Sequence, residues 1–235
     1  MRSKYDTLLF DFGGTLDADG IAWKERMHAH YAAEGVALEA EAFAPAFFAA
    51  DDPLVGGLPA QADLSATVAS LARNLEAELA MRGQPAAGGR GERVAKRFLA
   101  EAEAAFARNR PLLHVLAGRY RVGVVSNFYG NLEAVCRGAG LASWFGTIVD
   151  SQRVGAEKPD PAIFKAALEP LRARPETTLF IGDSLKRDRE GARRMGMDFL
   201  WIAPPAVAAA EEVASGGRLP HPVLAELPAL AEFLS

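Results

Sequence analysis

The segment Thr7–Asp17, TLLFDFGGTLD, decides the organisation of this chain. Its opening run, TLLF, is continuously apolar or β-branched rather than alternating, which is typical of a strand buried on both faces of a parallel sheet. Asp11 comes directly after that run, and the pair Gly13–Gly14 then favours a tight turn. The segment therefore predicts a buried strand that ends on a carboxylate.

Four later runs have the same texture and are predicted as further strands: Val122–Val125, Thr147–Val149, Thr178–Ile181 and Phe199–Ile202. Helix-like segments lie between them: Asn131–Gly138, Pro161–Leu171 and Lys186–Met195. This alternation predicts an α/β fold with a doubly wound parallel sheet. We expect residues 222–234, PVLAELPALAEFL, to form one more amphipathic helix on this core.

A long helical region, rich in Ala and Glu, separates the first strand from the second. Breakers divide it into four predicted helices: Trp23–Glu34, Glu39–Ala50, Ala62–Ala80 and Glu92–Arg108. We therefore expect an α/β core domain formed by residues 1–17 and 109–235. Residues 18–108 are expected to form an all-helical domain inserted after the first strand.

The composition is that of a globular protein, since 50% of the 235 residues are hydrophobic and 24% are charged. The net charge of −4 leaves no basic excess, so we expect no binding to nucleic acid or to an anionic membrane. The single cysteine, Cys136, excludes an internal disulfide framework. The apolar run before Asp11 is too short for a signal peptide and no segment spans a bilayer. We expect a cytoplasmic monomer or homodimer.

Polar side chains follow the predicted strands where the strands end. They comprise three acids, a hydroxyl–amide pair and one lysine: Asp11, Asp183, Asp188, Ser126, Asn127 and Lys158. Ligands of open α/β sheets bind outside the carboxyl ends of the strands, so we expect these side chains to share one site.

Three converging acids need a cation, because two like charges at roughly 4 Å repel by about 4 kcal/mol at an effective dielectric of 20. An all-oxygen set suits Mg²⁺ better than Zn²⁺. Together with Lys158, such an ion could bind a phosphoryl group, with Ser126 donating a hydrogen bond. An aspartate that faces the phosphorus could act as a covalent nucleophile.

The chain resembles the haloacid dehalogenase-like (HAD) hydrolase superfamily through four motifs: FDFGGTLD (10–17), VVSN (124–127), EKPDPAIF (157–164) and IGDSLKRDREGARRMG (181–196). The helical insert lies where that family commonly carries a cap domain. The resemblance implies that Asp11 is the nucleophile, that Lys158 supports it, and that Ser126 and Asn127 help to bind the substrate with Lys158. It implies magnesium ligands at Asp11, the Gly13 carbonyl, Asp183 and Asp188.

One position departs from the family pattern. Phosphatases of this family usually carry a second aspartate two residues after the nucleophile, where it protonates the leaving group, and here that position is Gly13. General acid catalysis is worth roughly 10²–10⁴-fold, so the loss matters. The proton could instead come from water, from Asp17 or Asp19 in the segment that follows Leu16 (the flap), or from His28 or His30 in the first insert helix. Alternatively, the substrate has a good leaving group.

The departure also leaves other chemistries open. Dehalogenases and phosphonatases of the family lack the second aspartate as well; phosphonatases use a cap lysine, for which Lys24 and Lys96 are the candidates. Dehalogenases need no metal, so the acids at 183 and 188 argue against that branch. We expect a magnesium-dependent phosphatase of a small phosphorylated metabolite. The alternatives are a phosphate- or metal-binding homologue with little turnover, or a phosphonatase- or dehalogenase-like hydrolase.

Overall fold

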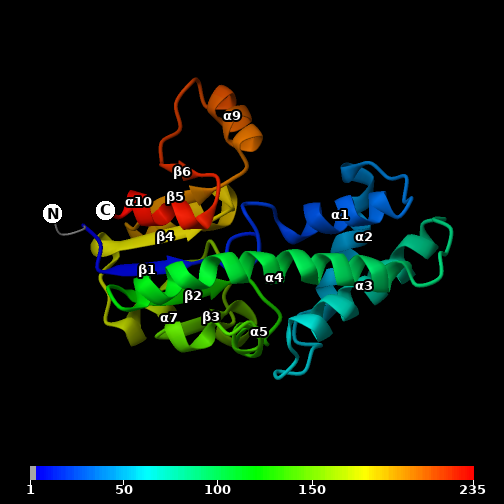
Figure 1. The fold of residues 1–235 in the computed structure, drawn as a ribbon, viewed down its shortest axis with the longest axis horizontal. Coiled ribbons are helices and arrows are strands. Elements are labelled where there is room, and N and C mark those ends of the chain that lie inside the picture. Colours follow the sequence, from blue (N-terminus) through cyan, green and yellow to red (C-terminus); the bar gives the residue numbers. More distant parts are fainter. Residues whose placement is uncertain (1–3) are drawn as a thin grey trace.

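The computed structural model describes residues 4–235, so residues 1–3 of the expected core segment lie outside the described part. Six parallel strands form one sheet in the order β3-β2-β1-β4-β5-β6 (Figure 1). Their bounds are β1 Thr7–Phe10, β2 Arg121–Ser126, β3 Thr147–Asp150, β4 Thr178–Gly182, β5 Asp198–Ile202 and β6 Val223–Leu224. The predicted α/β fold with a doubly wound parallel sheet is confirmed.

Strand β1 lies in the middle of the sheet and places the acidic end of the first motif. Phe10 is in register with Val124 of β2 and with Ile181 of β4. The next residue, Asp11, is therefore level with Val125, one residue before the end of β2, and with Gly182 at the end of β4. Because all the strands are parallel, their carboxyl ends meet at this edge.

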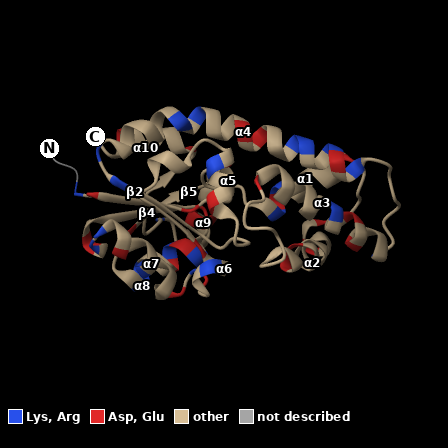
Figure 2. Ribbon diagram, turned by 90° about the horizontal axis from the view of Figure 1, so that it is seen from below, with Lys and Arg blue, Asp and Glu red and all other residues tan. Residues whose placement is uncertain are grey.

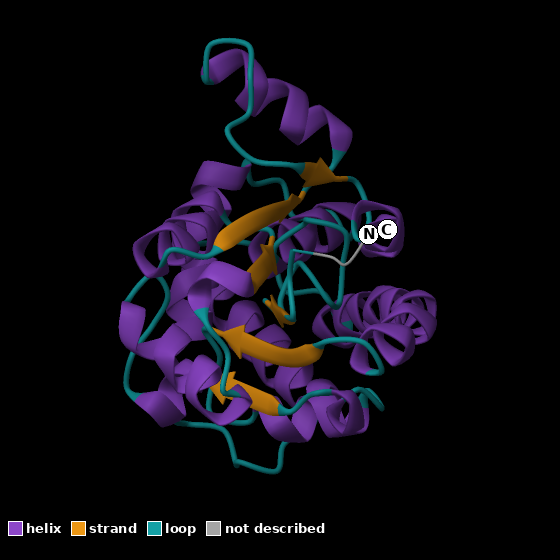
Figure 3. Cartoon of the chain, turned by 90° about the vertical axis from the view of Figure 1, so that its left-hand side faces the viewer, coloured by secondary structure: helices purple, strands orange, loops and turns teal. Residues whose placement is uncertain are grey.

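Helices cover both faces of the sheet (Figure 3). The helices of the core are α5 Leu132–Gly138, α6 Ser151–Val154, α7 Pro161–Leu171, α8 Glu190–Met195, α9 Pro205–Ala214 and α10 Leu230–Phe233. Helix α9 has no buried residue and stands away from the sheet, beyond the edge strand β6 (Figure 1). Alternate residues of β1 pack into two different apolar clusters: Leu8 and Phe10 into one, Leu9 into the other. Burial on both faces explains why this strand has a continuous apolar sequence.

The prediction of one helix over residues 222–234 is wrong. Val223–Leu224 forms the edge strand β6, in register with Trp201 and Ile202 of β5. Only a 3₁₀ turn, Leu227–Ala229, and the short helix α10 follow. Pro228 cannot donate the backbone hydrogen bond that a helix interior needs, which agrees with this late and short helix.

The region between β1 and β2 folds into four helices that form a cap on the core: α1 Trp23–Ala33, α2 Ala40–Asp51, α3 Leu64–Met81 and α4 Arg90–Ala117. Helix α4 is longer than predicted and runs unbroken through residue 109, where we expected the boundary between the domains. It extends alongside both the sheet and the other cap helices (Figure 1). Leu113 and Leu116 are buried, so packing on the core explains the extension.

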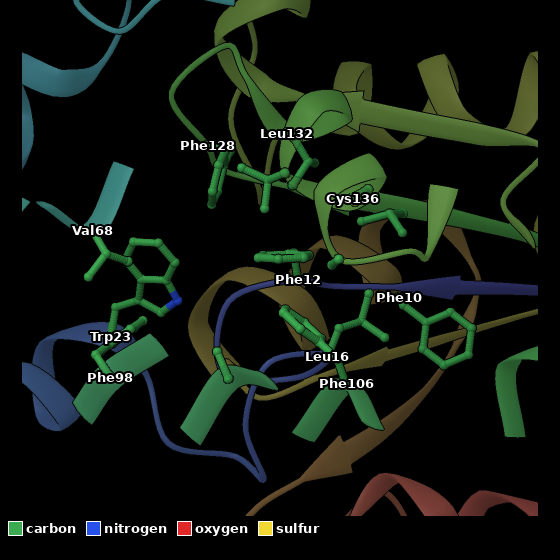
Figure 4. Packing of buried hydrophobic residues seen from close by; sticks show 14 of the residues in the cluster. Phe10, Phe12, Leu16, Trp23, Val68, Phe98, Phe106, Phe128, Leu132 and Cys136 are labelled. Carbon is green, nitrogen blue, oxygen red and sulfur yellow. The ribbon is translucent and has the colours of Figure 1, made fainter. Parts of the chain in front are cut away.

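Cap and core share one apolar cluster. Trp23 and Phe98 of the cap and Phe128 of the core lie close together (Figure 4), and the Trp23 ring centroid is 4.9 Å from that of Phe98 and 5.8 Å from that of Phe128. The position of the cap over the sheet edge is thus set by buried aromatic contacts.

The outer faces of the helices are charged. Basic and acidic residues both occur along them, most visibly on α4 (Figure 2). Of the helices described, none is both long enough and apolar enough to cross a bilayer.

Candidate active site

Four segments of the chain deliver side chains to one point at the carboxyl edge of the sheet. The Ser126 hydroxyl, at the end of β2, donates a hydrogen bond to Asp11 Oδ1 across 3.0 Å. Lys158 Nζ lies 2.5 Å from the same oxygen and 2.8 Å from Asp188 Oδ1. All four side chains are buried, so a network of charge-assisted contacts holds Asp11 in place.

The three predicted acids come together. Asp11, Asp183 and Asp188 each offer a carboxylate oxygen, and these oxygens lie within 4.8 Å of one another. Gly14 permits this approach, since a Cβ there would lie 2.4 Å from Asp183 Oδ2 and its φ of +91° disfavours a side chain. The backbone N–H of Ser184 donates to Asp188 Oδ2 at 3.0 Å.

The cluster carries excess negative charge. Burial raises the pKa of Asp183 well above its usual value, and the charges of Asp11 and Asp188 raise it further. Burial also raises the pKa of Asp188, to about 6, against the opposing effect of Lys158. Burial alone would lower the pKa of Lys158, but the charges of Asp11 and Asp188 outweigh it and the net shift is upward.

A divalent cation fits this arrangement. One lysine cannot balance three carboxylates, and all the donors are hard oxygens at a spacing that one ion could bridge. We therefore find the donor set suited to Mg²⁺, with Asp11, Asp183 and Asp188 as the side chains that could hold it.

Asn127 holds the lysine loop. Its Oδ1 accepts a hydrogen bond from the backbone N–H of Lys158 at 2.7 Å, and its Nδ2 donates to the Lys158 carbonyl at 3.3 Å. Both residues also line the cavity above the acids. The side chain of Asn127 therefore fixes the backbone from which Lys158 reaches Asp11.

Trp23 occupies the space beside Gly13. A Cβ on Gly13 would lie 3.2 Å from Trp23 Nε1. The indole N–H donates to Asp17 Oδ2 at 2.7 Å, and Asp17 also accepts from the Gly14 backbone at 2.6 Å and pairs with Arg26 at 2.8 Å. Asp17 is thus fully engaged beneath the cap.

The other proton donors suggested by the sequence are also engaged elsewhere. Asp19 pairs with Arg108 at 2.6 Å, and His30 lies 3.1 Å from Glu101. His28 Nε2 lies 2.7 Å from the Leu38 carbonyl. None of these side chains lines the cavity above the acids, and neither does Asp17. Of the two cap lysines, Lys24 lines it and Lys96 does not.

A cavity of about 660 Å³ lies between the acids and the cap. Its cap side includes residues that the sequence analysis did not assign to the site: Trp23, Glu25, Phe47, Phe48, Asp51, Asp52 and Val55. Tyr129 lines it from the core. No motif marks these positions, because each reaches the cavity only through docking of the cap on the sheet.

A parallel α/β sheet with a buried acidic cluster beneath a helical cap defines a class of hydrolases with a common core. A model of that class, described as haloacid dehalogenase-like hydrolase, matches residues 5–196. The chain belongs to this family, which confirms the resemblance drawn from its motifs.

Curated relatives match only in part. Haloacid dehalogenase-like hydrolase domain-containing protein 3 of Bos taurus is 41% identical over 85 residues, which are 36% of this chain and 34% of that protein. Phosphoserine phosphatase of Thermus thermophilus is 40% identical over 65 residues, which are 28% of this chain and 26% of the relative. The chain thus matches about a third or less of the length of these relatives.

The similarity to a solved structure extends over the whole chain. The crystal structure of the HAD-hydrolase YfnB from Bacillus subtilis, bound to magnesium, matches with a TM-score of 0.57 at 20% identity. The match covers 100% of this chain and 99% of the other. It shows that core and cap share one known architecture.

Proposed function

We propose that this protein is a magnesium-dependent phosphatase of a small phosphorylated metabolite, acting through an aspartyl-phosphate at Asp11. One observation carries the proposal: Asp11 lies between a hydroxyl donor and a lysine, with two further carboxylates within 4.8 Å. The relationship to a phosphoserine phosphatase supports it. In this proposal, the core domain of residues 1–17 and 109–235 carries the nucleophile and the metal ligands, and the cap domain of residues 18–108 contacts and selects the substrate.

The chemistry follows from the contacts. The carboxylate of Asp11 attacks phosphorus, the bond to the leaving oxygen breaks, and water then hydrolyses the acyl phosphate. Lys158 balances the charge on Asp11. Ser126 donates to Asp11 and Asn127 lines the same cavity, and we propose that both help Lys158 to bind phosphoryl oxygens. Bound Mg²⁺ would offset the charge of the carboxylates and the phosphoryl group. Asp183, Asp188 and the Gly13 carbonyl are the proposed ligands, together with Asp11.

The test is Asp11→Asn, which preserves the size of the side chain but removes the nucleophilic charge. We expect it to abolish magnesium-dependent hydrolysis of 4-nitrophenyl phosphate. Asp63→Asn is the matched control, because Asp63 caps α3 and an amide oxygen caps a helix equally well. Unchanged turnover by the Asp11 variant would reject the proposal.

The replacement of the usual second aspartate by Gly13 supports a second candidate, a phosphate- or metal-binding protein with little turnover. Tight Mg²⁺ binding, with no hydrolysis across a broad panel of phosphate esters, would favour it. The position of Lys24 on the cavity supports a third candidate, phosphonatase-like chemistry. Trapping of a lysine adduct by borohydride would reveal it, and metal-free halide release would reveal a dehalogenase.

A further inference from the structure

Phosphoester hydrolysis at Asp11 leaves one requirement unmet at the sheet edge. An alkoxide is a poor leaving group unless it receives a proton as the bond to phosphorus breaks. Gly13 has no side chain, and the indole of Trp23 fills the space beside it. The donor must therefore come from another wall of the cavity.

We propose that Asp51, at the end of helix α2 in the cap, is the general acid that protonates the leaving group. The inference rests on the proposed function. It follows from the contacts that Asp51 makes across the boundary between cap and core.

Asp51 is tied to the same loop that carries the phosphoryl-binding side chains. The Tyr129 hydroxyl donates to Asp51 Oδ1 at 2.6 Å, and the Gly56 backbone N–H donates to the Tyr129 carbonyl at 3.2 Å. Tyr129 is three residues beyond Ser126. The first contact fixes the Asp51 carboxyl on this loop, and the second ties the turn that follows α2 to the same residue, so Asp51 has a defined position relative to the site, as a proton donor requires.

The second oxygen of Asp51 is available. Oδ2 accepts no hydrogen bond from any residue in the described range, and Asp51 lines the same cavity as Asp11. The leaving group must lie on the cap side of the phosphorus, because Asp11 attacks from the side of the sheet. That is the side from which Asp51 enters the cavity.

The other acids on this cavity wall are less suited. Glu25 is exposed and pairs with Lys24 at 3.0 Å, and Asp52 and Glu157 are exposed. Asp51 is half-buried, and burial raises its pKa. The hydrogen bond from Tyr129 and the charge of Arg187 lower the pKa of Asp51, and the charge of Asp52 raises it. The net shift is upward. A raised pKa favours the protonated carboxyl that the first step needs.

The steps balance. As the bond between Asp11 and phosphorus forms, the bond to the leaving oxygen breaks and the Asp51 proton moves to that oxygen, which departs as an alcohol. The Asp51 carboxylate then takes a proton from water as the water oxygen attacks phosphorus and releases Asp11. Phosphate departs, and Asp51 is again protonated.

The experiment measures kcat/KM for a series of aryl phosphates whose phenols range from 4-nitrophenol to phenol. This parameter reports the first phosphoryl transfer, and every substrate in the series has a detectable product. Asp51→Asn keeps an oxygen for the Tyr129 hydroxyl but has no proton to transfer. We expect little change with 4-nitrophenyl phosphate, whose anion leaves unaided. For phenyl phosphate we expect a loss that approaches roughly 10²-fold, so that the dependence on leaving-group acidity steepens.

Glu41→Gln provides the matched control, because it removes one carboxylate from an exposed position of the same helix. The dependence of its kcat/KM on leaving-group acidity should equal that of the wild type. If kcat/KM of Asp51→Asn depends on leaving-group acidity as steeply as that of the wild type, the assignment of Asp51 is overturned, even if kcat/KM falls equally for every substrate. Asp11→Asn separates the two proposals. If Asp11→Asn abolishes turnover, while Asp51→Asn shows the same dependence of kcat/KM on leaving-group acidity as the wild type, only the general-acid proposal fails.

Discussion

Asp183 is predicted to destabilise the metal-free fold, and Asp183→Asn tests this. The substitution keeps the shape of the side chain and removes one of three converging charges. Asp183 lies within 4.8 Å of oxygens of both Asp11 and Asp188. At an effective dielectric of 20, each such ionised pair repels by about 3.5 kcal/mol. The attraction of Lys158 and the raised pKa of Asp183 offset much of this.

We expect a net gain of about 1–3 kcal/mol in the free energy of unfolding, which for a chain of this size raises the Tm by roughly 2–12 °C. The assay is thermal unfolding in EDTA at neutral pH. Adding Mg²⁺ should raise the Tm of the wild type through preferential binding to the native state, and should raise that of the variant much less. Asp63→Asn controls for the loss of one carboxylate.

The extra stability of Asp183→Asn in EDTA should increase as the pH rises. The pKa of Asp183 is higher in the folded state than in the unfolded state, so stability falls as the pH rises from the unfolded-state pKa to the folded-state pKa. The pKa of Asp188, about 6, shifts in the same direction. The variant should therefore match the wild type well below about pH 4, where Asp183 is protonated in both states, and exceed it at neutral pH. A variant that is less stable than the wild type in EDTA at neutral pH would refute the reasoning.

Two further predictions concern contacts between the first motif and the cap. Arg26→Met leaves the buried Asp17 without its ion-pair partner and should cost about 3–5 kcal/mol, measured as a lower urea midpoint; a loss below about 1 kcal/mol would contradict this. Gly13→Asp restores the usual aspartate, but its Cβ would meet the Trp23 indole at 3.2 Å. It should therefore give none of the roughly 10²–10⁴-fold gain expected of a working general acid. A gain of that size on phenyl phosphate would show that Trp23 moves aside.

Much of the core could be predicted from local sequence. Strands buried on both faces need continuous apolar runs, so β1, β2, β3, β4 and β5 were recognisable, and each lies within a residue or two of its predicted bounds. The edge strand β6 was missed. It has only two residues, and its backbone pairing with β5 leaves no periodic pattern in the sequence.

Some features of the cap depend on contacts between residues that are distant in the sequence. Its four helices were predicted, but the end of α4 was not, because Leu113 and Leu116 join the core only through long-range packing. The same limit applies to the flap. Asp17 follows the first motif and was a candidate proton donor, yet tertiary contacts with Trp23 and Arg26 turn it away from the cavity.

Adjacency to a buried apolar run is enough to place Asp11, Ser126 and Asp183 at the ends of strands, and parallel pairing then brings them to one edge of the sheet. What faces them across the cavity is set by long-range packing. Trp23 fills the space beside Gly13, and Asp51 meets Tyr129, 78 residues away along the chain. Docking of the cap depends on contacts between residues distant in the chain, and no local pattern encodes such contacts.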